Sequence, residues 1–195
     1  MAGNTENGSG RRGSRWRIAV WSTAAFVFLV PFLAMQFTED VAWDLADFAV
    51  FGTMLVGACG TYELAARLTD DTTYRLAVGV ALAAAFILVW LSLGVGIIGR
   101  DGDPANLMYF GVLAVGIIGA LIARFRPRGM ARALFAAALA QTSVAVIALI
   151  AGLGYPWSGQ LELSVLNGFF VALFVGSAWL FRRAANGRPE RGAVS

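Results

Sequence analysis

The chain has 195 residues, of which 58% are hydrophobic and only 14% are charged. A soluble domain averages about 45–50% apolar and about 25% charged residues, so this apolar excess is too large for one globular core to bury. The composition excludes an ordinary soluble domain and predicts an integral membrane protein with the length of a single domain.

The residue types that are missing exclude several kinds of cofactor, metal and disulfide site. There is no His and no Lys, so all 15 basic residues are Arg, and the one Cys, Cys59, lies in an apolar run. Without His the chain cannot supply axial His ligands to haem, a His-based zinc or copper site, or a His general base. We therefore expect no cofactor and no metal site, and a lone Cys rules out a disulfide framework.

The ends of the chain differ in composition from its middle. Residues 1–15 and 184–195 are polar and have no apolar period, which predicts disordered cytoplasmic tails on either side of a membrane domain over residues 16–183. Six apolar runs follow one another inside that domain, each long enough to cross a hydrocarbon core of about 30 Å as a helix. The runs cover residues 17–36, 45–66, 75–98, 107–124, 130–153 and 162–181.

Short connections between these runs make consecutive helices antiparallel neighbours. The predicted fold is therefore an all-α integral membrane protein, an antiparallel bundle of about six transmembrane helices. The first run also resembles a signal peptide, but it is long and no A-x-A site follows it, so we expect it to be retained.

The distribution of arginine predicts the orientation. With the N-terminus in the cytoplasm, every arginine except Arg100 lies on the inner side, and the positive-inside rule favours that arrangement. Both termini are then cytoplasmic in a multi-pass protein of the bacterial inner membrane. The sequence pI near 9.6 does not indicate a nucleic-acid partner, because the arginines flank apolar runs and act as topology signals.

Three stretches resemble a family of small polytopic bacterial inner-membrane proteins. They are MQFTEDVAWDLADFAVFG, the pair Tyr62-Glu63, and NLMYFGVLAVGIIGALIARFRPRGMARALFAAALAQ. The resemblance covers about residues 28–183 and implies a multi-pass topology and a bacterial origin. It implies no activity, cofactor or catalytic residue.

Carboxylates gather where the second run begins. Asp44 and Asp47 start that run, and Glu39 and Asp40 come just before it. One interpretation is helix capping and compensation of the helix dipole, which favours acids at an N-terminus. The other is a mouth that attracts cations or binds a basic partner.

Glu63 lies near the inner end of the same run, four residues before Arg67. That order favours an ion pair along one helix face. Alternatively, Glu63 is a buried carboxylate that moves protons or ions, because ionisable residues inside a membrane are functional candidates.

Polar side chains also occur within the later runs. Gln141 lies at the middle of the fifth run, followed by Thr142 and Ser143, and Asn167 and Ser92 lie in the sixth and third runs. Hydrogen bonds between helices would use these groups, and a polar path for a solute would need several of them to converge.

We expect the Gln141 amide to face another helix, since an unpaired amide in hydrocarbon is costly. Ala137, Ala138, Ala145 and Ala148 lie on or beside the same face, so that face should pack closely against a neighbour.

Two further motifs have simple structural interpretations. Residues 94–99 match G-x-G-x-x-G, but they end an apolar run instead of following a strand, which favours helix packing and a loop. Asp101, Asp103 and Asn106 offer oxygen ligands for Ca²⁺, yet they lack the length and final Glu of an EF-hand. We expect a turn there, with Asp103 or Asn106 leading into the next helix.

Three functional classes remain. The favoured one is a non-catalytic accessory or interaction protein, whose partners are the lipid bilayer and other membrane proteins or copies of itself. The alternative is a small transporter or channel that uses Glu63, Asp47 and Gln141. An enzyme is least favoured, because no catalytic constellation is present.

Overall fold

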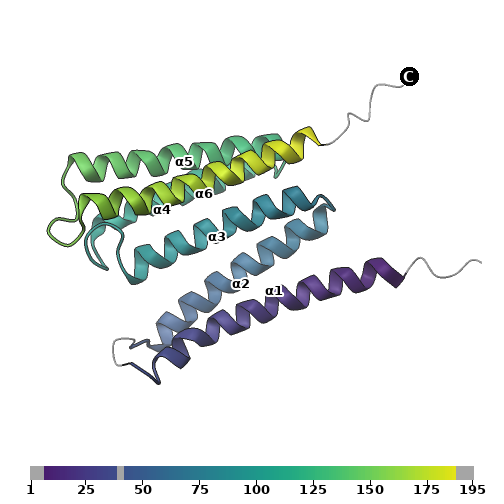
Figure 1. The fold of residues 1–195 in the computed structure, drawn as a ribbon, viewed down its shortest axis with the longest axis horizontal. Helices are drawn as coiled ribbons and strands as arrows, with labels where there is room; N and C mark the ends of the chain where they lie inside the picture. Colours follow the sequence, from purple (N-terminus) through teal and green to yellow (C-terminus); the bar gives the residue numbers. More distant parts are fainter. Residues whose placement is uncertain (1–6, 39–41, 188–195) are drawn as a thin grey trace, which may run out of the picture. The chain divides into compact units, whose positions relative to one another are not determined.

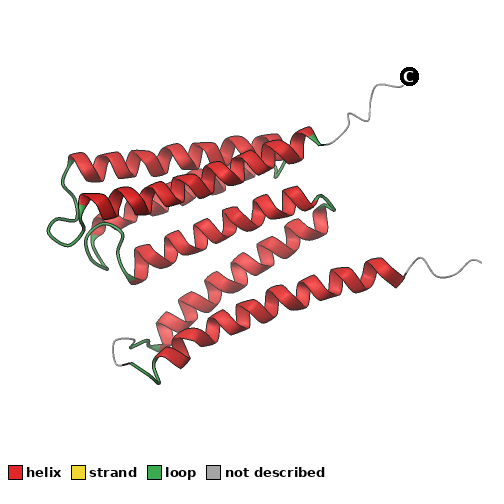
Figure 2. Cartoon of the chain, viewed as in Figure 1, coloured by secondary structure: helices red, strands yellow, loops and turns green. Residues whose placement is uncertain are grey.

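The computed structural model describes residues 7–38 and 42–187, and within those ranges it is helical with no strand (Figures 1 and 2). Six of its helices are long and apolar enough to cross a membrane, which confirms the predicted number. They are α1 (Asn7–Ala34), α2 (Leu45–Leu68), α3 (Thr72–Gly94), α5 (Pro127–Ile150), α6 (Gln160–Asn186) and, as the fourth along the chain, the continuous segment of the short 3-10 helix η1 (Pro104–Leu107) and α4 (Met108–Ile122).

The outer helices extend further than the sequence suggests. α1 begins at Asn7, so residues 7–15 are helical where a disordered tail is expected, and α6 continues to Asn186. Adding a residue to an existing helix costs much less than nucleating one, so a strongly helical span extends into polar flanks. The rest of both expected tails lies outside the described residues.

The chain divides into two compact units, Met1–Arg67 and Leu68–Ser195. The first unit contains α1 and α2. The second contains η1 and α3 to α6.

Aromatic rings join α1 and α2 within the first unit. Phe28 of α1 meets Phe48 edge-on with ring centroids 5.8 Å apart, and it stacks on Phe51 at 6.3 Å. Trp43, just before α2, contacts the same two rings at 5.2 and 5.3 Å. Gly52 makes room for Phe28, because a Cβ at that position would lie 3.1 Å from the Phe28 ring.

In the second unit, α5 packs against α4 and α6, and α3 packs against α6. The interior holds large side chains that are almost wholly buried, among them Leu88, Tyr109, Phe170 and Phe181. Two hydrogen bonds accompany this apolar packing. Ser177 donates to the Ala77 carbonyl at 2.8 Å, and Tyr74 donates to the Phe125 carbonyl at 2.7 Å. These bonds tie α3 to α6 and to the α4–α5 connection.

Small residues allow α4 and α5 to approach closely. A Cβ on Gly119 would lie 2.7 Å from the Cβ of Ala133, and a Cβ on Gly116 would lie 3.8 Å from that of Ala137. Gly116 and Gly119 are therefore positions of close packing between α4 and α5. By contrast, a Cβ on Gly111 would meet nothing within 4 Å.

The α3–α4 and α5–α6 connections bind to each other. The Asn106 amide oxygen accepts hydrogen bonds from the backbone N–H groups of Ile97 and Ile98 at 2.9 and 3.0 Å, and Gly99 donates its backbone N–H to Ser158 Oγ at 2.9 Å. The Arg100 guanidinium lies 4.5 Å from the centre of the Trp157 ring. The G-x-G-x-x-G stretch thus begins at the end of α3 and continues into a braced loop.

Asp103 and Asn106 have separate roles at the start of the next helical segment. Asp103 caps η1 by accepting the backbone N–H of Ala105 at 2.9 Å, as expected for a residue that leads into a helix. Asn106 instead braces the preceding loop, because its amide also donates to the carbonyls of Ile98 and Arg100.

Candidate functional sites

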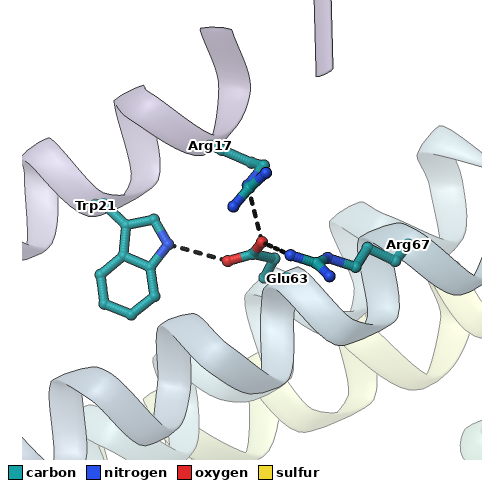
Figure 3. A network of polar contacts seen from close by, with 4 residues as sticks. All are labelled: Arg17, Trp21, Glu63 and Arg67. Atoms are coloured by element: carbon teal, nitrogen blue, oxygen red, sulfur yellow. Dashed lines mark hydrogen bonds and ion pairs between the residues drawn. The ribbon is translucent and has the colours of Figure 1, made fainter. Parts of the chain in front are cut away.

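Three side chains meet around Glu63 in the first unit, and we call the four residues the Glu63 cluster: Arg17, Trp21, Glu63 and Arg67 (Figure 3). Glu63 Oε1 forms an ion pair with Arg17, whose Nε lies 2.8 Å away, and accepts a hydrogen bond from Arg67 Nη2, while Oε2 accepts the indole N–H of Trp21 at 3.0 Å. The predicted pair of Glu63 with Arg67 is confirmed, and α1 adds two further donors.

Helical spacing explains why these side chains converge. Arg17 and Trp21 are four residues apart on one face of α1, and Glu63 and Arg67 are four apart on one face of α2. The Glu63 side chain is only 15% exposed, whereas the side chains of Arg17 and Arg67 are 61% and 64% exposed. The carboxylate is therefore shielded by its own donors, and the guanidinium groups remain accessible.

Asp44 and Asp47 form a separate arrangement where α2 begins. The backbone N–H of Asp47 donates to Asp44 Oδ1 at 2.9 Å, and that of Asp44 donates to Asp47 Oδ2 at 2.9 Å. This reciprocal pattern is a capping box, which satisfies backbone donors that the first turn leaves unpaired. The structure thus supports the capping interpretation of both residues. Glu39 and Asp40 lie outside the described residues.

The two acidic positions of α2 do not share a site. Asp47 and Glu63 are sixteen residues apart, which corresponds to about 24 Å along a helix. One bound ion cannot contact both carboxylates while α2 keeps this form, so the structure separates two residues that a single ion path would combine.

A buried polar group joins three helices of the second unit, and we call it the Asn167 cluster: Tyr109 of α4, Gln141 of α5 and Asn167 of α6. Asn167 Oδ1 accepts hydrogen bonds from Gln141 Nε2 at 2.9 Å and from the Tyr109 hydroxyl at 3.1 Å. Asn167 Nδ2 donates to the Leu163 carbonyl at 2.8 Å. All three residues are at most 1% exposed.

The expectation for Gln141 is confirmed. Its amide bonds a residue of another helix, and Ala137, Ala138 and Ala148 on or beside its face are buried, with Ala145 partly buried. The amide carbonyl is different, because Oε1 is the one buried side-chain polar atom of the described residues without a hydrogen-bond partner. An unsatisfied buried acceptor costs about 1–3 kcal/mol and requires an explanation.

Neighbouring polar residues do not extend the Asn167 cluster. Thr142 and Ser143 donate their hydroxyls to carbonyls four residues earlier in α5, and Ser92 does the same within α3. Local bonding of this kind satisfies the hydroxyl inside its own helix. The idea that Gln141, Thr142 and Ser143 act together is therefore not supported by these contacts.

Sequence reasoning missed several participants. The sequence does not single out Trp21 or Tyr109, and it marks Arg17 only as a topology signal, because basic residues at the ends of apolar runs have that role in general. The i, i+4 spacing of Arg17 and Trp21 marks a shared face, but nothing in the sequence indicates that Glu63 lies opposite.

The described residues contain no group of three or more His, Cys, Asp or Glu side chains arranged to hold a metal ion. What the fold defines is an all-helical protein with six helices suited to crossing a membrane, two of which carry the Glu63 cluster and three the Asn167 cluster. No protein-family model, functionally curated protein or solved structure matches the chain.

Proposed function

We propose that this protein crosses the bacterial cytoplasmic membrane six times, as antiparallel helices with both termini in the cytoplasm. Six helices of sufficient length and hydropathy support insertion. The position of Arg100 as the only arginine on the opposite side supports the orientation.

Within the membrane, the protein acts as an accessory protein that packs against other membrane proteins, and it uses no cofactor and no nucleic acid. The observation that carries this proposal is the open face of α2. Thr53, Gly57, Gly60 and Thr61 are exposed on that face, and a Cβ on either glycine would meet nothing within 4 Å. In lipid, small residues let another helix approach closely, and close packing is what holds helices together there.

Site-specific photo-crosslinking in intact cells tests the proposal. A photoreactive residue at Val56, on the edge of the open face, should give a discrete protein adduct. The same residue at Leu139, an exposed position of α5, should give only lipid adducts. Identical lipid labelling at both positions would count against an interaction role.

A second candidate is a small transporter or channel, and the unpaired carbonyl of Gln141 is the observation that favours it. A solute with a hydrogen-bond donor would satisfy that carbonyl while it passes the Asn167 cluster. A thermal-shift screen of polar solutes tests the idea: a transported solute should stabilise the natural protein and have no effect on Gln141→Leu.

A further inference from the structure

We propose that the Glu63 cluster is a binding site for the phosphate group of an anionic phospholipid, held between the guanidinium groups of Arg17 and Arg67. The inference rests on the proposed function in one respect, because it requires α1 and α2 to lie in a bilayer.

The charge of the cluster is unbalanced. Two guanidinium groups share a single carboxylate oxygen, so the two positive charges are brought together and one of them is not neutralised. A phosphodiester carries one negative charge and would complete the balance. It would also lower the repulsion between the two guanidinium groups, since each could then face an anion of its own.

Donors for that anion are available. Arg17 uses Nε and Arg67 uses Nη2 to hold Glu63, and among the described residues neither guanidinium has a further partner for its remaining N–H groups. Both side chains are more than half exposed, which leaves their guanidinium groups accessible to a ligand. A planar guanidinium presents paired N–H groups that match two phosphate oxygens, which makes arginine well suited to this contact.

The carboxylate has a positioning role. A free arginine side chain samples many rotamers and loses that freedom on binding. Here Glu63 fixes one end of each guanidinium before a lipid arrives, and the Trp21 indole holds the second carboxylate oxygen in place. The site is thus pre-organised, which lowers the entropic cost of capturing a headgroup.

The depth of the cluster suits a headgroup. Arg67 lies in the last turn of α2, and Trp16 and Trp21 are exposed beside Arg17 on α1. Tryptophan side chains prefer the interface between hydrocarbon and headgroups, and basic residues at that level attract anionic lipids of the cytoplasmic leaflet. A phosphate at this depth belongs to a lipid, which is why we assign the site to a headgroup and not to a free anion.

Lipid titration of the purified full-length chain in neutral detergent tests the site. The probes are phosphatidylglycerol, phosphatidylcholine and inorganic phosphate, and the readout is the rise in unfolding temperature. Phosphatidylglycerol should stabilise the natural protein more strongly than the other two. The double variant Arg17→Gln/Arg67→Gln should bind it at least about tenfold more weakly, because charge-assisted hydrogen bonds are lost.

A control with the same change in net charge is Arg128→Gln/Arg182→Gln, since both residues are exposed arginines outside the cluster. It should retain binding to within about twofold. If the glutamine double variant loses helix content, Arg17→Lys/Arg67→Lys replaces it and should also bind more weakly, because lysine keeps the charge but not the paired donors.

Equal weakening in the cluster and control variants would overturn the proposal, because it would indicate diffuse charge attraction. So would stabilisation by inorganic phosphate as strong as that by lipid. Neither result bears on a protein partner at α2, and failure of the crosslinking experiment leaves the lipid titration unaffected.

Discussion

Two polar residues of this protein, Glu63 and Asn167, each contact several polar partners at once. Glu63 contacts three side chains, two from α1 and one from α2, and Asn167 makes three hydrogen bonds, two of which connect α6 to α4 and α5. Replacing either central residue removes several contacts at once, whereas replacing one of its partners removes a single contact. Two predictions at the residue scale follow from this asymmetry.

The first concerns the Glu63 cluster. Glu63→Gln should lower the unfolding temperature in detergent more than Arg67→Gln does, because the first change removes the negative charge that all three partners contact and the second removes one of those partners. Tryptophan fluorescence during heating measures both. A Glu63→Gln protein more stable than the natural one would contradict the pairing, since relief of an unpaired buried charge would then outweigh the lost contacts.

The second concerns the Asn167 cluster. Asn167→Leu should destabilise the protein by about 1–3 kcal/mol more than Gln141→Leu does. Replacing Gln141 loses one hydrogen bond, of roughly 0.6 kcal/mol and at most about 2, but it also removes the unsatisfied carbonyl. Chemical unfolding in mixed micelles measures both variants. Equal losses would mean that another molecule satisfies Gln141 Oε1, which is the requirement of the transporter candidate.

At the scale of helices, packing in the second unit relies on positions where side chains are smallest. α4 and α5 approach through Gly116 and Gly119 on one side and Ala133 and Ala137 on the other. In lipid there is little hydrophobic drive to bring helices together, so van der Waals contact at such positions carries much of the association. α1 and α2 are instead held together by aromatic contacts near the α1–α2 connection and by the Glu63 cluster near the opposite end of the helix pair.

Substitution of the helix glycines tests this packing. Gly119→Val should destabilise the second unit by about 1–3 kcal/mol through overpacking, because a Cβ there already collides with Ala133. Gly111→Val is the matched control in the same helix, and it should be nearly neutral because nothing lies within 4 Å of its Cβ position. Equal effects on the unfolding temperature would show that helix propensity, and not the α4–α5 contact, sets the cost.

The described helices carry many large apolar side chains that the fold does not bury. Large apolar side chains remain exposed along all six helices, for example Phe26, Val56, Ile117 and Phe135. A bilayer would accept that surface, and in the proposed topology the arginines of the short connections set the orientation.

Reporter fusions test the proposed topology. Fusions at Asp70 and Arg128 should report the cytoplasm, and fusions at Asp103 and Trp157 should report the outer side, as alternating connections of a six-span protein require. An outer signal at Arg128 would overturn the six-span arrangement, because the connection before α5 is rich in arginine and has no acid.

The sequence by itself determined the class of fold and the number of long apolar helices, since both follow from composition and from the length of each run. It also predicted local pairs such as Glu63 with Arg67, because helical periodicity places residues four apart on one face. Only the tertiary structure decided that Trp21 and Arg17 complete the Glu63 cluster, and that Tyr109 and Asn167 meet Gln141. Contacts between residues far apart in sequence depend on how each helix is rotated toward its neighbour. In a chain whose helices are apolar on nearly every face, periodicity does not reveal that rotation.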